Sequence, residues 1–166
     1  MKDEVGEVHG GSFAGYAVTA SGRVSAWGTT VTEMGIALTK DSIDIGIVVA
    51  DIAAALTFYR DTLGFTDAGT MDMPGGGVMH RLLCGTSMIK LVDPGKPLET
   101  KAPRGGIQGA YGYRYWTISV SNIEELAASV GSAGYKVVVP VTTLRPGITI
   151  AIVVDPDGNW VEFLQT

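Results

Sequence analysis

Cysteine, charge and long apolar runs are the features of which this sequence has least. The single cysteine, Cys84, excludes an internal disulfide and fits a reducing cytoplasm. Charged residues make up only 17%, the net charge is −5 and no basic patch is present, so we expect no nucleic-acid partner. No apolar run reaches the roughly 20 residues of a membrane span, and the acidic start lacks the apolar segment of a signal peptide. These absences predict a cytoplasmic protein that does not contact a membrane.

Apolar residues make up 46% of the 166 residues, which is enough for one globular domain with a core. Residues 1–41 stand apart from the rest of the sequence. Met1–Gly11 is polar, and Phe13–Val31 is rich in Gly, Ser, Thr and Ala. Tyr16–Thr19 and Val24–Trp27 could pair as a β-hairpin with Gly22 in the turn, and Thr29–Thr39 could add a strand. We interpret this stretch as an N-terminal extension that packs on the main domain or on a second subunit.

The pattern sharpens from Ser42 onward. Ile43–Val49 is a β-branched strand, and Asp51 is a good N-cap for a helix whose apolar residues repeat at helical spacing. Gly64 suits the end of that helix. The strands that we expect next are Phe65–Met73, Val78–Cys84 and Met88–Val92. Together these elements predict a βαβββ unit.

A second unit of the same order follows a linker rich in glycine and proline. Ser121 and Glu124 form the pattern of a capping box ahead of the second helix. The strands that we expect here are Tyr113–Val120, Tyr135–Val141, Ile148–Asp155 and Trp160–Leu164. Val49-Ala-Asp-Ile52 matches Val120-Ser-Asn-Ile123, which indicates an internal duplication.

The duplication sets the expected domain boundaries. Residues 1–41 form the extension, and residues 42–166 form one domain. Within that domain we expect module one at 42–95, the linker at 96–112 and module two at 113–166.

Three stretches carry a family resemblance: Ile47-Val-Val-Ala-Asp51, Phe58-Tyr-Arg-Asp-Thr-Leu-Gly-Phe65, and Asp155-Pro-Asp-Gly-Asn159 with Glu162. Together they resemble the vicinal oxygen chelate superfamily, which includes glyoxalase I, extradiol dioxygenases, fosfomycin-resistance enzymes and bleomycin-binding proteins. The resemblance implies an α+β fold in which two tandem βαβββ modules form a curled mixed sheet around one cleft. It also implies a small-molecule substrate or ligand and a homodimer.

In metal-dependent members of this superfamily, a His on the first strand and a Glu or Gln on the last strand of each module hold a divalent ion. The matching positions here are Asp44, Lys90, Tyr115 and Glu162. Only Glu162 keeps a family residue, and lysine has no lone pair to give at neutral pH. We therefore expect no cofactor. An alternative is a divalent-metal-dependent lyase or dioxygenase with altered ligands, in which Asp44, Glu162 and His80 hold a Zn, Ni, Fe or Mn ion.

Charge suggests what replaces the metal. Asp44 and Glu162 would face one another across the cleft, with Lys90 as their counter-charge. We predict a metal-independent lyase, isomerase or ring-opening hydrolase in which either carboxylate is the base, Lys90 stabilises negative charge and Tyr115 is a donor. One alternative is a protein that sequesters a drug or metabolite without chemistry. Another is an ion pair that merely fills an inactive site.

Four more residues are candidates for the same cleft. His80 and Arg81 are strand neighbours, so alternation sends only one of them inward; we keep His80 as a catalytic candidate and Arg81 as a substrate-binding one. Trp116 and Trp160 are further substrate-binding candidates, although such tryptophans more often belong to the core.

Overall fold

The computed structural model describes residues 6–9, 15–18, 24–27, 36 and 38–166. Backbone contacts divide the chain into residues 1–40 and residues 41–166. In the first part, β1 (Gly6–His9), β2 (Gly15–Val18) and β3 (Val24–Trp27) form an antiparallel sheet in that order. The strand expected at Thr29–Thr39 falls almost wholly outside the described residues.

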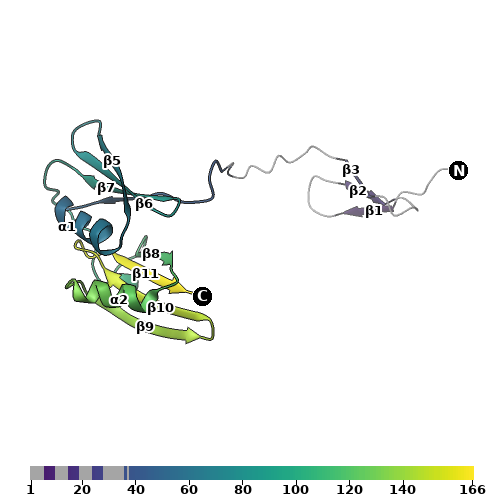
Figure 1. Cartoon of the computed structure of the whole chain (residues 1–166). Helices are drawn as coiled ribbons and strands as arrows, with labels where there is room; N and C mark the ends of the chain where they lie inside the picture. Colours follow the sequence, from purple (N-terminus) through teal and green to yellow (C-terminus); the bar gives the residue numbers. More distant parts are fainter. Residues whose placement is uncertain (1–5, 10–14, 19–23, 28–35, 37) are drawn as a thin grey trace. The chain divides into compact units, whose positions relative to one another are not determined.

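Residues 41–166 contain two βαβββ modules, as the sequence predicts (Figure 1). Module one consists of β4 (Ile45–Val48), α1 (Ile52–Leu56), the π-helical η1 (Thr57–Thr62), β5 (Thr66–Asp72), β6 (Val78–Cys84) and β7 (Ser87–Asp93). Its strands lie in the order β4-β7-β6-β5, with β4 parallel to β7 and the other pairs antiparallel.

The helix of module one begins where the sequence predicts. The Asp51 carboxylate accepts hydrogen bonds from the backbone N–H groups of Ala53 and Ala54, which have no partner inside the helix. The helix then widens into a π turn, because Leu63 N–H donates to the carbonyl of Phe58, five residues back. This wide turn brings both aromatic side chains of the Phe58-Tyr59 pair into the core, where each is fully buried.

Module two repeats the arrangement after the short 3₁₀ helix η2 (Gly106–Gln108). It consists of β8 (Tyr115–Ser119), α2 (Ile123–Ser132), β9 (Val137–Arg145), β10 (Ile148–Val154) and β11 (Trp160–Gln165). Its strands lie in the order β8-β11-β10-β9. As in module one, β8 is parallel to β11 and the other pairs are antiparallel. In the part of the chain that the structure describes, no helix is long and apolar enough to cross a membrane.

The capping box expected at the N-terminus of α2 is wrong. No capping box forms, because the N-cap residue is Asn122 and its side chain makes no capping hydrogen bond. The Oε1 atom of Gln165, on the last strand, instead accepts a hydrogen bond from Ile123 N–H at 3.0 Å. The helix start is therefore stabilised by a residue from the far end of the module.

One apolar core runs through both modules. Its fully buried members include Phe58, Tyr59 and Leu91 from module one and Val153 and Phe163 from module two. Helix α1 contacts β7, and α2 contacts β9, β10 and β11 (Figure 1). Burying the apolar faces of both helices against the sheets is the main source of stability.

A hydrogen bond joins the two modules and links two of the motifs noted in the sequence. Asp155 is only 4% exposed, and its carboxylate accepts from the Tyr59 hydroxyl at 2.8 Å. It also accepts from Asp157 N–H and from the backbone and side-chain N–H groups of Asn159. The Asp157 carboxylate in turn accepts from Ala50 N–H, at 3.1 Å for the nearer oxygen. The turn that follows β10 thus holds the modules together.

Candidate functional site

The site residues expected on module one lie on the face of its sheet that is turned away from the core, which we call the open face. Lys90 on β7 alternates with the buried Ile89 and Leu91 and therefore lies on this face. The strand register pairs Lys90 with Gly46 on β4 and with Arg81 on β6. Gly46 and Arg81 therefore share the open face with Lys90.

Asp44, just before β4, is the partner of Lys90. The Lys90 Nζ atom lies 3.4 Å from Asp44 Oδ2, and Met88 N–H donates to Asp44 Oδ1 at 3.0 Å. The two charged side chains are 34% and 27% exposed. Both carboxylate oxygens of Asp44 are thus engaged within module one.

Glu162 lies on the open face of module two, between the buried Val161 and Phe163. Its cross-strand neighbour on β8 is Thr117, whose hydroxyl donates a hydrogen bond to Glu162 Oε2. Sequence reasoning missed Thr117. The sequence could have indicated it, because Thr117 lies two residues after Tyr115 and so lies on the same face of the strand.

Tyr115 and Trp160 are cross-strand neighbours at the first residues of β8 and β11. They share the open face with Glu162, since Tyr115, Thr117 and Ser119 alternate with the less exposed Trp116 and Ile118. Tyr115 remains 45% exposed. The open face of module two therefore carries a carboxylate, a hydroxyl and two aromatic side chains.

Two expected site residues lie on the opposite face. His80 pairs across the sheet with the buried Leu91, so it lies on the core face while Arg81 lies on the open face. Trp116 packs in the core near Tyr59 and Phe65, with ring centroids 6.3 and 6.4 Å away. Neither His80 nor Trp116 joins the open-face residues, because strand alternation turns each of them toward the helices.

The linker between the modules covers part of the open face of module two. Gly106 is buried against the indole of Trp160, and a Cβ atom at Gly106 would lie 2.0 Å from Trp160 Cζ2. The Arg114 guanidinium holds this segment, donating to the carbonyls of Gly106 and Pro103, both at 2.7 Å. We call residues 103–109 the strap.

The charged residues of the two open faces each have a partner within their own module. Lys90 pairs with Asp44, and Glu162 pairs with Thr117. Within residues 38–166 no ion pair joins Lys90 to Glu162. The Lys90 ammonium is therefore the counter-charge of Asp44, one of the two carboxylates of the expected site.

The side chains present do not fit the divalent ion that the superfamily pattern implies. Lys90 occupies one of the four ligand positions, and its ammonium neutralises the carboxylate of Asp44 at a second. His80, the third ligand of the alternative metal site, lies on the core face. Among the described residues, no group of three or more His, Cys, Asp and Glu side chains is arranged to hold a metal.

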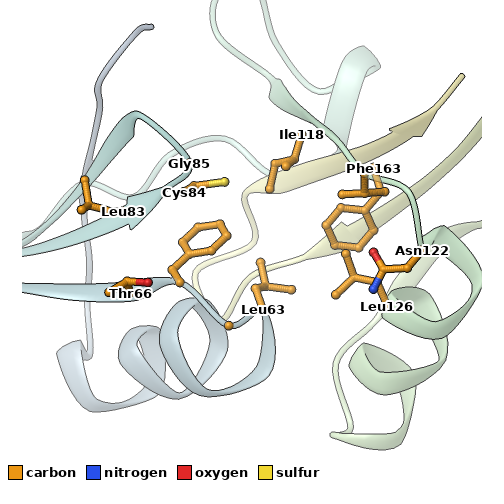
Figure 2. A pocket seen from close by; sticks show the side chains of 12 residues that line it. Leu63, Thr66, Leu83, Cys84, Gly85, Ile118, Asn122, Leu126 and Phe163 are labelled. Carbon is orange, nitrogen blue, oxygen red and sulfur yellow. The ribbon is translucent and has the colours of Figure 1, made fainter.

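A pocket of about 300 Å³ lies on the core side, between the modules (Figure 2). Its lining is mostly apolar and includes Leu63, Ile118, Leu126 and Phe163, with the thiol of Cys84 at one wall. Burial raises the pKa of this thiol. Ile118 and Phe163 alternate with the open-face residues, so this pocket is separate from the candidate site.

Comparisons with known proteins agree with this architecture. The profile of the Glyoxalase/Bleomycin resistance protein/Dioxygenase superfamily matches residues 42–163. A glyoxalase family protein from Bacillus cereus superposes with a TM-score of 0.64 at 18% identity, over 73% of this chain and 90% of its own. The trypanothione-dependent glyoxalase I of Leishmania major superposes with a TM-score of 0.58 at 24% identity, over 74% of this chain and 84% of its own.

A glyoxalase/bleomycin resistance protein from a Streptomyces species superposes with a TM-score of 0.56 at 20% identity, over 76% of this chain and 100% of its own. No curated protein matches the sequence. At these identities the structural likeness establishes the fold alone. The profile match extends over most of the chain, and the protein belongs to the glyoxalase/bleomycin resistance protein/dioxygenase superfamily.

Proposed function

We propose that this protein is a small-molecule enzyme that moves protons without a bound metal, with Glu162 as the general base. The observation that carries the proposal is the pairing of Glu162 with a hydroxyl, where Asp44 is paired with a cation. A carboxylate held by one neutral donor keeps an oxygen available for a proton, whereas Asp44 has both oxygens engaged.

The chemistry that suits this arrangement is proton abstraction from a carbon next to a carbonyl. Thr117 would hold Glu162 Oε2 and leave Oε1 directed to the substrate. The proton would pass from the substrate carbon to Oε1, and the electron pair would move onto the carbonyl oxygen. Tyr115 would donate a hydrogen bond to that oxygen as its charge develops. Return of the proton to another atom gives an isomerase, and loss of a leaving group gives a lyase.

Lys90 would contribute by its charge. In the superfamily fold the open faces of the two modules line a shared cleft, and the proposal places Lys90 opposite Glu162 across it. An ammonium fixed by Asp44 would stabilise an enolate without having to reorganise. This role follows from the residue at this ligand position, because Lys90 supplies positive charge where metal-dependent relatives hold a cation.

A second candidate is a binding protein without chemistry. It is favoured by the tyrosines ahead of β8, since the side chains of Tyr111 and Tyr113 are fully exposed. With Tyr115 they would offer aromatic surface to a flat ligand. This candidate predicts binding that survives the loss of Glu162.

Solvent deuterium exchange distinguishes the two candidates. The protein would be incubated in D₂O with pyruvate, 2-oxobutanoate or hydroxyacetone, and loss of the C–H signals would be followed by proton NMR. The enzyme proposal expects catalysed exchange that is abolished by Glu162→Gln and kept by Glu125→Gln, a matched change at an exposed glutamate on α2. Exchange that is equal in both variants contradicts a base role for Glu162.

A further inference from the structure

Arg81 and Lys90 place two cations side by side on the open face of module one. They are direct cross-strand neighbours on β6 and β7, an arrangement in which like charges destabilise a sheet. Lys90 is neutralised by Asp44. In residues 38–166 no carboxylate lies within ion-pair distance of Arg81, and its Nε atom is buried without an acceptor. The pair therefore carries one positive charge that the described part of the chain leaves unbalanced.

A glycine lies beside each of the two cations. Gly69 lies at a bulge in β5 with φ +84°, and a Cβ atom there would lie 3.5 Å from Arg81 Nη2. Gly46, which faces Lys90 from β4, has no atom within 4 Å of the place where its Cβ would be. Glycines and bulges of this kind often mark places where a ligand approaches a sheet. The guanidinium of Arg81 thus packs over Gly69, and open space lies beside Lys90 at Gly46.

We propose that Arg81 and Lys90 bind an oxyanion of the substrate, so that the substrate class is a small organic acid carrying a carboxylate or a phosphoryl group. A planar guanidinium donates two parallel N–H bonds to such a group, and the ammonium adds a point charge. The inference rests on the proposed function, because it assigns the anionic end of the same substrate to module one and the reacting carbon to Glu162 on module two.

Direct titration tests this assignment without any need for turnover. Benzoate and phenylphosphonate would be titrated into the protein by NMR, with benzamide as the neutral analogue of the same shape. Arg81→Met removes the proposed contact, Arg81→Lys keeps the charge, and Arg145→Met is a matched loss of charge at an exposed position on β9. Thermal melts of each variant would confirm that it is folded.

We expect saturable binding of the two anions that Arg81→Met weakens about ten- to hundredfold, with Arg81→Lys in between, because a charge-assisted hydrogen bond is lost. Arg145→Met should stay within about twofold of the parent. Equal losses in Arg81→Met and Arg145→Met would overturn the inference. So would equal affinity for benzamide and benzoate, or the absence of saturable binding by either anion.

The same probes separate this inference from the proposed function. If the anions bind through Arg81 while Glu162→Gln leaves deuterium exchange unchanged, the base assignment fails and the oxyanion site stands. If exchange of neutral hydroxyacetone is as fast as that of pyruvate and benzoate does not inhibit it, the oxyanion site fails and the base assignment stands.

Discussion

Replacing Tyr59 with phenylalanine tests the hydrogen bond that joins the modules. The change removes only the hydroxyl, which is fully buried and lies 2.8 Å from Asp155 Oδ2. Asp155 keeps its three donors from Asp157 and Asn159 but loses the one from module one. A hydrogen bond to a charged group contributes about 1.5–3 kcal/mol, so we expect a loss of about 2 kcal/mol in the free energy of unfolding.

The pH dependence of this loss provides a second test. Burial and the neighbouring Asp155 carboxylate raise the pKa of Tyr59 in the folded protein. Above about pH 10 the unfolded chain releases the Tyr59 proton while the folded chain retains it, so the unfolded state gains stability. The contribution of Tyr59 is therefore complete below pH 10 and declines above it. The difference between the parent and Tyr59→Phe should narrow as the pH rises from 9 to 11.

Urea unfolding followed by tryptophan fluorescence measures both effects. The matched control is Tyr135→Phe, because Tyr135 also contacts Phe58 in the core but makes no hydroxyl hydrogen bond among the described residues. Its loss should stay below about 0.5 kcal/mol. Equal losses for the two variants, or a Tyr59→Phe difference that does not change with pH, would refute the role of this bond.

Two further predictions concern the open face and the strap. In double-mutant cycles of unfolding free energy, Lys90→Met should couple with Asp44→Asn by about 0.5–1 kcal/mol, the size expected of a partly exposed ion pair. It should not couple with Glu162→Gln. A coupling with Glu162→Gln instead would show that the lysine reaches the second module. In urea melts, Gly106→Ala should lower the free energy of unfolding by about 1–3 kcal/mol more than Gly112→Ala does. Both glycines have positive φ, but only a Cβ at position 106 meets an indole ring. Equal costs would mean that the strap does not press on the ring.

The elements of residues 42–166 were predictable because the sequence repeats them. Asp51 marks the start of the first helix and Gly64, with φ +77°, its end, so local chemistry alone defined that element. The second helix was harder. Its first N–H is satisfied by Gln165, more than forty residues away, and no local pattern announces a partner at that distance.

The candidate site was predictable only in part. Strand alternation put Glu162 and Lys90 on definite faces, and it left His80 or Arg81 as alternatives. The choice between them, and the pairing of Glu162 with Thr117, depend on how separate strands align. That register is set by packing across the whole sheet and cannot be obtained from any one strand.

The most direct test of the account is the metal dependence of deuterium exchange. The protein would be stripped with a chelating resin, its content of Zn, Ni, Fe and Mn determined by plasma mass spectrometry, and exchange of 2-oxobutanoate measured before and after each metal is added back. We predict that the stripped protein exchanges at the full rate and that Glu162→Gln abolishes this rate. Exchange that appears only when one of these metals is restored would contradict the account.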